Sequence, residues 1–138
     1  MSEALSLVRE LPAPRPSAFR AFVDSDELRA WFWPSRFDVA TAVDLREGGG
    51  YFLRSEVVGI GVSGRYVEVS APQSLGFDWT WDGEQLTTSV RLEFEEAGST
   101  TRLRLSHSGF KTPQQRDDHV QGWKDCLDRL EIHLAAPR

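Results

Sequence analysis

The stretch SLGFDWTWDG, residues 74–83, places Phe77, Trp79 and Trp81 two residues apart. Side chains alternate between the two faces of a β-strand, so these three rings are expected on one face. The turn-forming residues DGEQ follow and end the strand. Each ring removes roughly 150 to 250 Å² of surface from water when it is buried. The stretch therefore predicts a strand with a large aromatic face, which another layer of the protein has to cover.

Short β-like runs separated by turn residues lie on both sides of this stretch. They are FDVATAVDL (37–45), YFLRSEVV (51–58), VSGRYVEVS (62–70), LTTSVRLEFEE (86–96) and TTRLRLSHS (100–108). In the last two, apolar and polar side chains alternate, which indicates one buried and one solvated face. The connections have hairpin length, so six strands are expected in one antiparallel meander. An opening strand, EALSLVREL (3–11), adds a seventh and ends at prolines.

Two short helices are expected between the opening strand and the meander. Pro16 suits the first turn of the first helix. Asp24 and Glu27 have the spacing of an N-terminal capping box, so a second helix begins there. Pro34 ends it.

The clearest helix follows Thr112, where Thr112, Pro113 and Gln115 form a helix start, and no further proline occurs before Pro137. Its apolar stripe consists of Trp123, Leu127, Leu130 and Leu134, with His119 and Cys126 at one margin. Such an amphipathic helix needs a sheet to lie on. The sequence therefore predicts an α+β fold over residues 1–138, a single domain in which a curved antiparallel sheet wraps the C-terminal helix and a gap remains between them.

Composition excludes several classes of partner. The chain has 138 residues, a net charge of −5 and scattered basic residues, so nucleic acid is not an expected partner. No stretch approaches the roughly 18 apolar residues of a membrane span, and none resembles a signal peptide. The single cysteine forms no internal disulfide. We expect a cytoplasmic protein, monomer or homodimer, without a cofactor.

Several motifs, in order along the chain, resemble the START-like (SRPBCC) helix-grip superfamily, and within it the branch of the activator of heat-shock-protein-90 ATPase homologues. They are LPAPRPSAFRAFVDSDELRAWFWP (11–34), VDLREGGGYF (43–52), GRYVEVSAPQSLGFDW (64–79), LRLSHSGF (103–110) and HVQGWKDCLDRL (119–130). The resemblance spans nearly the whole chain. It implies the helix-grip fold, with a cavity between the sheet and the closing helix.

The same resemblance implies unlike functions, because members of the superfamily carry hydrophobic ligands, cyclise polyketides or stimulate a chaperone in stress responses. The chain also departs from the family pattern. Trp31, Phe32, Trp33 and Pro34 stand where Trp-Trp-Gly-Pro is common. The bulk of Trp33 would narrow the mouth of a cavity.

The candidate site is this cavity. Aromatic rings from the 74–81 strand and Trp123 from the closing helix would line it, since wide rings fill a gap between sheet and helix imperfectly. Dense core packing is the alternative interpretation. The ligand-binding candidates are Trp31, Trp33, Phe37, Phe52, Arg54, Phe77, Trp79, Trp81, Phe94, His107, Phe110, His119, Trp123 and Leu127.

Polar candidates have two interpretations each. His107 and His119 are either structural histidines or neutral anchors for a ligand, with an acid-base pair as a third alternative. The dipole of the closing helix disfavours a protonated His119 near its first turns. Arg54 and Glu56 share a strand face with Phe52, so they line the cavity rim if Phe52 points inward and are solvated if it points outward.

Metal and nucleophilic chemistry are not expected. His119 and Cys126 are seven residues apart, about 10 Å along a helix, which is too far to share one ion. Cys126 lies in mid-helix and is expected to act as a small hydrophobe. We therefore expect a non-enzymatic carrier or sensor of a small hydrophobic or aromatic molecule. A co-chaperone-like module with a chaperone partner, and a cyclase or hydrolase acting on an aromatic substrate, are the alternatives.

Overall fold

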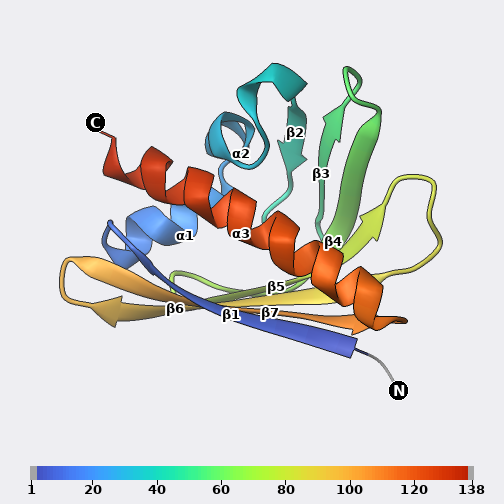
Figure 1. Ribbon diagram of the computed structural model, residues 1–138. Coiled ribbons are helices and arrows are strands. Elements are labelled where there is room, and N and C mark those ends of the chain that lie inside the picture. Colours follow the sequence, from blue (N-terminus) through green and yellow to red (C-terminus); the bar gives the residue numbers. More distant parts are fainter. Residues whose placement is uncertain (1–2, 137–138) are drawn as a thin grey trace.

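The computed structural model describes residues 3–136, and Figure 1 shows how their elements are arranged. These residues form seven strands, three α-helices and one short 3-10 helix. The elements are β1 (Glu3–Leu11), α1 (Arg15–Val23), α2 (Ser25–Trp31), η1 (Ser35–Phe37), β2 (Ala40–Val43), β3 (Gly50–Ser55), β4 (Ile60–Ser70), β5 (Ser74–Trp81), β6 (Thr88–Ala97), β7 (Thr100–Phe110) and α3 (Pro113–Ala135).

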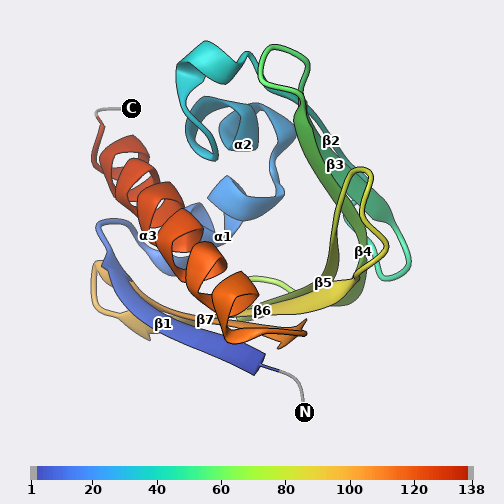
Figure 2. The ribbon, with the colours of Figure 1, turned by 45° about the vertical axis from the view of Figure 1, so that its right-hand side comes forward.

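The strands form one antiparallel sheet in the order β1-β7-β6-β5-β4-β3-β2. From β2 to β7 each strand pairs with the next along the chain, and β1 closes the other edge beside β7. The sheet curves, and α3 crosses its concave side with α1 and α2 next to it (Figures 1 and 2). The predicted α+β helix-grip fold is confirmed, including its meander and its two short helices.

The alternation of residues along the central strands fixes which face is buried. On β6, Val90, Leu92 and Phe94 are buried while the residues between them are exposed. On β7, Leu103, Leu105 and His107 are likewise buried, and the residues between them are exposed. The inner face receives α1, where the ring of Phe19 lies 5.3 Å from that of Phe94. The inner face of these two strands is therefore mainly apolar, with Thr88, Thr101 and His107 as its buried polar residues.

Both predicted helix starts have the expected caps. The side chain of Asp24 accepts a hydrogen bond from the backbone N–H of Glu27 at 3.0 Å, which begins α2. The Thr112 hydroxyl accepts one from the N–H of Gln115 at 3.1 Å, which begins α3. Each cap pairs a backbone donor that the helix itself leaves unsatisfied.

The closing helix holds the sheet by an apolar stripe on one side. Its buried residues are Trp123, Cys126, Leu127, Leu130 and Leu134. Leu127 and Leu130 have no exposed surface. Truncation of such a residue to alanine typically costs about 2 to 5 kcal/mol. This stripe therefore fixes the distance between α3 and the sheet, and with it the space beside the helix.

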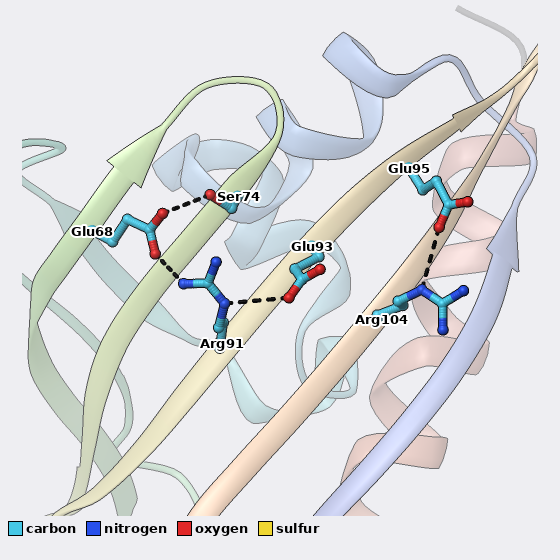
Figure 3. A network of polar contacts seen from close by, with 6 residues as sticks. All are labelled: Glu68, Ser74, Arg91, Glu93, Glu95 and Arg104. Carbon is cyan, nitrogen blue, oxygen red and sulfur yellow. Dashed lines mark hydrogen bonds and ion pairs between the residues drawn. The ribbon is translucent and has the colours of Figure 1, made fainter.

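The outer face of the sheet carries paired charges (Figure 3). Arg91 of β6 contacts Glu68 of β4, and its Nε donates to Glu93 at 3.3 Å. The Nε of Arg104 on β7 donates to Glu95 on β6 at 3.2 Å. Exposed pairs of this kind add little stability, but they give this face a polar surface. None of the helices within residues 3–136 has both the length and the apolar character needed to cross a membrane.

Candidate functional site

A cavity of about 370 Å³ lies between α3, the Phe32–Phe37 segment that follows α2, and the end of β5. Its rim reaches the exposed residues Asp118, Gly122 and Asp125 of α3, so it communicates with solvent. We call it the aromatic cavity. The residues that line it are Phe32, Trp33, Pro34, Phe37, Trp79, Trp81, Asp118, His119, Gly122, Trp123, Asp125, Cys126 and Arg129.

The Phe32–Phe37 wall is tied to α3 through the end of α2. Arg129 donates from Nε to the carbonyl oxygen of Trp31 at 3.2 Å and from Nη2 to that of Phe32 at 2.8 Å. The Cys126 thiol donates to the same Phe32 oxygen at 3.1 Å. The last carbonyls of a helix lack partners within it, and they carry the negative end of its dipole. A guanidinium is therefore well suited to this position.

The aromatic side chains contact one another around the cavity. Trp33 stacks on Trp81 with ring centroids 6.2 Å apart and planes 12° apart. Trp79 meets Trp81 edge to face at 5.4 Å, and its centroid lies 5.3 Å from that of Trp123. Trp33 lies between α2 and η1, Trp79 and Trp81 lie on β5, and Trp123 lies on α3. Three separate parts of the fold therefore fix the positions of these rings.

His107 lies behind Trp123 and is fully buried. Its Nδ1 accepts a hydrogen bond from the Trp123 indole N–H at 3.0 Å, so the ring proton is on Nε2. That nitrogen lies 2.6 Å from the Thr88 hydroxyl, which in turn lies 3.2 Å from the carbonyl oxygen of Trp79. Burial, and to a lesser extent His119, lower the pKa of His107 to about 3. The ring is therefore neutral at physiological pH.

His119 makes the equivalent contact with a second indole. Its Nε2 accepts from the Trp81 N–H at 2.9 Å, and its Nδ1 lies 2.7 Å from the carbonyl oxygen of Gln115, to which it donates. The rings of His107 and His119 are 5.2 Å apart. All four of their nitrogens are engaged within the protein. The two histidines hold two cavity tryptophans in place.

Trp79 differs from these neighbours. Among residues 3–136, its Nε1 is the one buried side-chain nitrogen or oxygen that has no hydrogen-bond partner. The residue is 4% exposed. Unpaired buried donors are rare in folded proteins and call for a specific explanation.

Six of the fourteen residues predicted from the sequence line the aromatic cavity. They are Trp33, Phe37, Trp79, Trp81, His119 and Trp123. Trp31, His107 and Leu127 lie in the core behind them. Phe110 lines an adjoining cavity of about 180 Å³ together with Trp79, Trp81 and His119.

Phe77 and Phe94 lie elsewhere on the inner face of the sheet. Phe77 packs edge to face against Tyr51 at 5.3 Å and lines a separate void of about 20 Å³, which shares Phe32 and Trp79 with the aromatic cavity. Phe94 packs against Phe19 and Phe22 of α1. The first ring of the 74–81 strand, Phe77, therefore builds core, and the other two reach the cavity.

Phe52 and Arg54 were predicted to line the cavity, and the structure contradicts this. Tyr51, Leu53 and Ser55 are the buried residues of β3, so the intervening Phe52 and Arg54 face outward. The Arg54 guanidinium lies over the Phe52 ring at 4.6 Å and pairs with Asp82 at 2.8 Å. The alternating pattern of the sequence does not show which face of β3 is buried, because Tyr51 lies on one face and Phe52 on the other.

The sequence missed seven lining residues, which are Phe32, Pro34, Asp118, Gly122, Asp125, Cys126 and Arg129. On α3, Asp118, Gly122, Asp125 and Arg129 follow one another at intervals of three or four residues and border the apolar stripe. Among these residues, Gly122 is the one whose position in the sequence could have indicated the cavity. A glycine inside a helix costs about 1 kcal/mol relative to alanine, and a Cβ added here would meet nothing within 4 Å.

Cys126 and the carboxylates do not form a reactive or metal-binding centre. Burial, opposed by Arg129, raises the pKa of the Cys126 thiol to about 12. A protonated thiol is a poor nucleophile and a poor metal ligand. Within residues 3–136 no group of three or more His, Cys, Asp or Glu side chains is placed to hold a metal ion.

Solved structures with the same fold cover nearly the whole chain. CV1439 from Chromobacterium violaceum matches with a TM-score of 0.85 and 22% identity, over 97% of this chain and 98% of the other. CalU16 from Micromonospora echinospora matches with a TM-score of 0.78 and 25% identity, over 97% and 77%. PFC0360w, an HSP90 activator from Plasmodium falciparum, matches with a TM-score of 0.76 and 23% identity, over 97% of each chain.

Sequence comparison gives the family directly. No curated protein matches the chain significantly. The family described as Activator of Hsp90 ATPase homolog 1-like protein matches residues 12–135, nearly the same span as the helix-grip fold. The chain belongs to this family.

Proposed function

We propose that the protein binds a small, mostly apolar aromatic molecule in the aromatic cavity and carries or senses it without converting it. The observation that carries this proposal is the cavity itself, about 370 Å³ bordered by six aromatic side chains. Ligand sites are usually concave, largely apolar and of this size, with a few polar groups that orient the ligand. Flat rings on several sides suit a flat ligand.

The cavity is held open in advance of binding. His119 fixes Trp81, His107 fixes Trp123, and Arg129 fixes the backbone before Trp33. A ligand that enters such a site does not have to order its walls, and this reduces the free-energy cost of binding. The same bonds explain why the rings do not collapse into the space.

The hydrogen bonding favours a carrier or sensor over an enzyme. A histidine acts as a general base through a free ring nitrogen, and both nitrogens of His119 are already engaged. His107 is buried, with a pKa near 3, and does not line the cavity. The Cys126 thiol, with a pKa of about 12, is not an activated nucleophile. The two carboxylates of the lining, Asp118 and Asp125, lie at the exposed rim, so among the described residues the interior of the cavity offers a cyclase or hydrolase no unengaged acid-base group.

A co-chaperone role is the alternative that the family suggests, and it calls for an exposed apolar surface. The large hydrophobic residues that are exposed are Val8, Leu45, Val57, Val58, Val67 and Ile132. They are spread over β1, two loops, β4 and α3, and paired charges occupy the outer face of the sheet (Figure 3). Scattered single residues of this kind are normal on protein surfaces. If the protein acted on a chaperone through its surface, a side chain that fills the aromatic cavity should leave that activity unchanged.

Titration with a neutral hydrophobic dye, N-phenyl-1-naphthylamine, tests the proposal. We expect saturable quenching of tryptophan emission at one dye per chain. Gly122→Leu places a side chain in the open space beside Gly122, and leucine is the better helix former. This variant should fold and should bind the dye at least tenfold more weakly.

Lys124→Leu is the matched control, because it adds the same side chain to an exposed position of α3 that does not line the cavity. It should bind the dye like the wild type. Absence of any dye response in the wild type, or equal binding by Gly122→Leu and Lys124→Leu, contradicts the proposal.

A further inference from the structure

The mouth of the aromatic cavity lies on α3 at Gly122. Asp118, Gly122 and Asp125 are the exposed residues of its lining, and each carboxylate is about one helical turn, roughly 5 Å, from Gly122 along the axis. A Cβ added at Gly122 would meet no atom within 4 Å, so the space beside it is open. A ligand group seated over Gly122 therefore lies between Asp118 and Asp125.

The two carboxylates at this mouth are not paired with a cation. Within residues 3–136, Asp118 and Asp125 form no ion pair, and each accepts one hydrogen bond from a nearby glutamine amide, at 2.8 and 3.1 Å. Elsewhere on the same helix, Asp117 and Asp128 each pair with an arginine, at 3.0 and 2.8 Å. The mouth therefore carries two negative charges that this part of the chain leaves without a counter-ion.

The guanidinium of Arg129 contacts the end of α2 instead of Asp125. The two residues have the i, i+4 spacing at which an acidic and a basic side chain of one helix can pair. The Nε and Nη2 of Arg129 donate to the carbonyl oxygens of Trp31 and Phe32. These carbonyls carry the negative end of the α2 dipole, which offsets part of the positive charge. Among the described residues that line the cavity, Arg129 is the one lysine or arginine.

The adjoining cavity of about 180 Å³ adds negative charge next to this mouth. Asp118 lines both cavities, and the exposed Glu84 lines the adjoining one. No lysine or arginine among residues 3–136 lines this second cavity. Trp81 also lines both cavities, and the face of an indole attracts cations. Carboxylates and an indole therefore meet here, and both favour a positively charged group over an anion.

We propose that the ligand of the aromatic cavity is a cationic arylalkylamine. Its aromatic body lies against the indole walls, and its ammonium group lies at the mouth over Gly122, between Asp118 and Asp125. Because the mouth is open to solvent, the ammonium group keeps part of its hydration and avoids the large cost of a buried charge. This inference rests on the proposed function and names the charge of its ligand. Asp118 and Asp125 act as specificity-determining residues.

Three naphthalene compounds that differ in one small group test the proposal. They are 2-naphthylmethylamine, which is protonated at neutral pH, the uncharged 2-naphthylmethanol, and the anion 2-naphthoate. Their dissociation constants are measured by equilibrium dialysis at low salt, with detection by ligand absorbance. We expect the wild type to bind the amine about fivefold more tightly than the alcohol, and the naphthoate more weakly than the alcohol.

The double variant Asp118→Asn/Asp125→Asn removes both charges of the mouth and keeps the shape of the side chains. Its preference for the amine over the alcohol should fall below about twofold, while its affinity for the alcohol should stay near that of the wild type. Asp117→Asn/Asp128→Asn is the matched control. It changes the net charge of the same helix equally, at exposed positions that line neither cavity, so the preference should remain about fivefold.

A salt series on the wild type keeps the proposal testable even if a variant does not fold. Exposed charges are screened by salt, so the affinity for the amine should approach that for the alcohol as NaCl rises from about 20 to about 500 mM. The affinity for the alcohol should change little. Gly122→Leu, which fills the mouth, should weaken the binding of both compounds.

The possible outcomes separate this inference from the proposed function. Equal binding of the amine and the alcohol, or tighter binding of the naphthoate, overturns the inference but leaves a binding cavity. Equal loss of the preference in the two double variants overturns the role of Asp118 and Asp125, and undiminished amine binding by Gly122→Leu places the amine outside the cavity. Absence of binding by all three compounds, together with no dye response, counts against both proposals.

Discussion

The indole nitrogen of Trp81 donates a hydrogen bond to Nε2 of His119 over 2.9 Å, and this bond joins the last residue of β5 to α3 beside the aromatic cavity. His119 is itself oriented by the carbonyl oxygen of Gln115. The position of one cavity wall is therefore set by a chain of two hydrogen bonds that begins in the helix backbone.

His119→Phe should loosen this wall. The variant removes the acceptor of the Trp81 N–H, so we expect the free energy of unfolding to fall by about 0.5 to 1.5 kcal/mol. Dye affinity should fall several-fold. Urea denaturation and dye titration measure the two effects. His119→Gln, which retains an acceptor oxygen, should lose less, and equal losses in both variants would contradict the role given to this bond.

His107 should make stability depend on pH. Its pKa is lowered to about 3 in the folded state, against about 6.5 in the unfolded chain. Between these values the unfolded state binds the extra proton, so the stability contributed by neutral His107 is complete above pH 6.5 and is lost as pH falls toward 3. Within this range, the contribution of His107 lowers the free energy of unfolding by up to about 1.4 kcal/mol for each pH unit that the pH falls.

Comparison with His107→Gln isolates that term from the carboxylates. The advantage of the wild type over the variant, measured by urea denaturation from pH 7.5 to 4.5, should shrink as pH falls below 6.5. A difference that stays constant across this range would show that His107 is not kept neutral by burial.

Arg129→Ala should destabilise the wall formed by the end of α2. The carbonyl oxygen of Trp31 would lose its side-chain donor and that of Phe32 would keep only the Cys126 thiol, at a cost of about 1 to 3 kcal/mol in unfolding free energy. Dye binding should weaken as well, because Phe32 and Trp33 border the cavity. Arg102→Ala, at an exposed position of β7, is the control and should change neither quantity.

The orientation of β3 can be checked by a pair of neighbouring variants. Tyr51 is buried, and its hydroxyl donates to the carbonyl oxygen of Asp78 at 2.6 Å, so Tyr51→Ala should cost about 3 to 5 kcal/mol. Phe52→Ala on the outer face should cost less than about 1 kcal/mol. Both are read from thermal or urea unfolding. If Phe52→Ala cost more stability than Tyr51→Ala, Phe52 would be the residue that faces the core.

The fold could be predicted because each element carries a local signal. Turn residues separate the strands, Asp24 and Thr112 cap two helices, and the Trp123–Leu134 stripe identifies the closing helix. These signals depend on neighbours in the sequence and need no tertiary information. The order of the meander then follows from its short connections.

The site could be predicted only in part, because a cavity depends on distances between elements. Trp79 and Trp81 were recognisable as aromatic residues of one strand face, but Phe77 on that face packs against Tyr51 and Tyr66 instead. Arg129 is an ordinary helix-surface residue in sequence. Only its contact with the end of α2, about a hundred residues earlier, makes it part of the cavity wall.

Native mass spectrometry of the protein purified from its own host shows whether the aromatic cavity holds a small molecule. We expect one small aromatic molecule bound per chain, absent from Gly122→Leu and retained by Lys124→Leu. Bare chains in all three preparations, in a protein that also fails to bind neutral aromatic compounds when they are added, would contradict it.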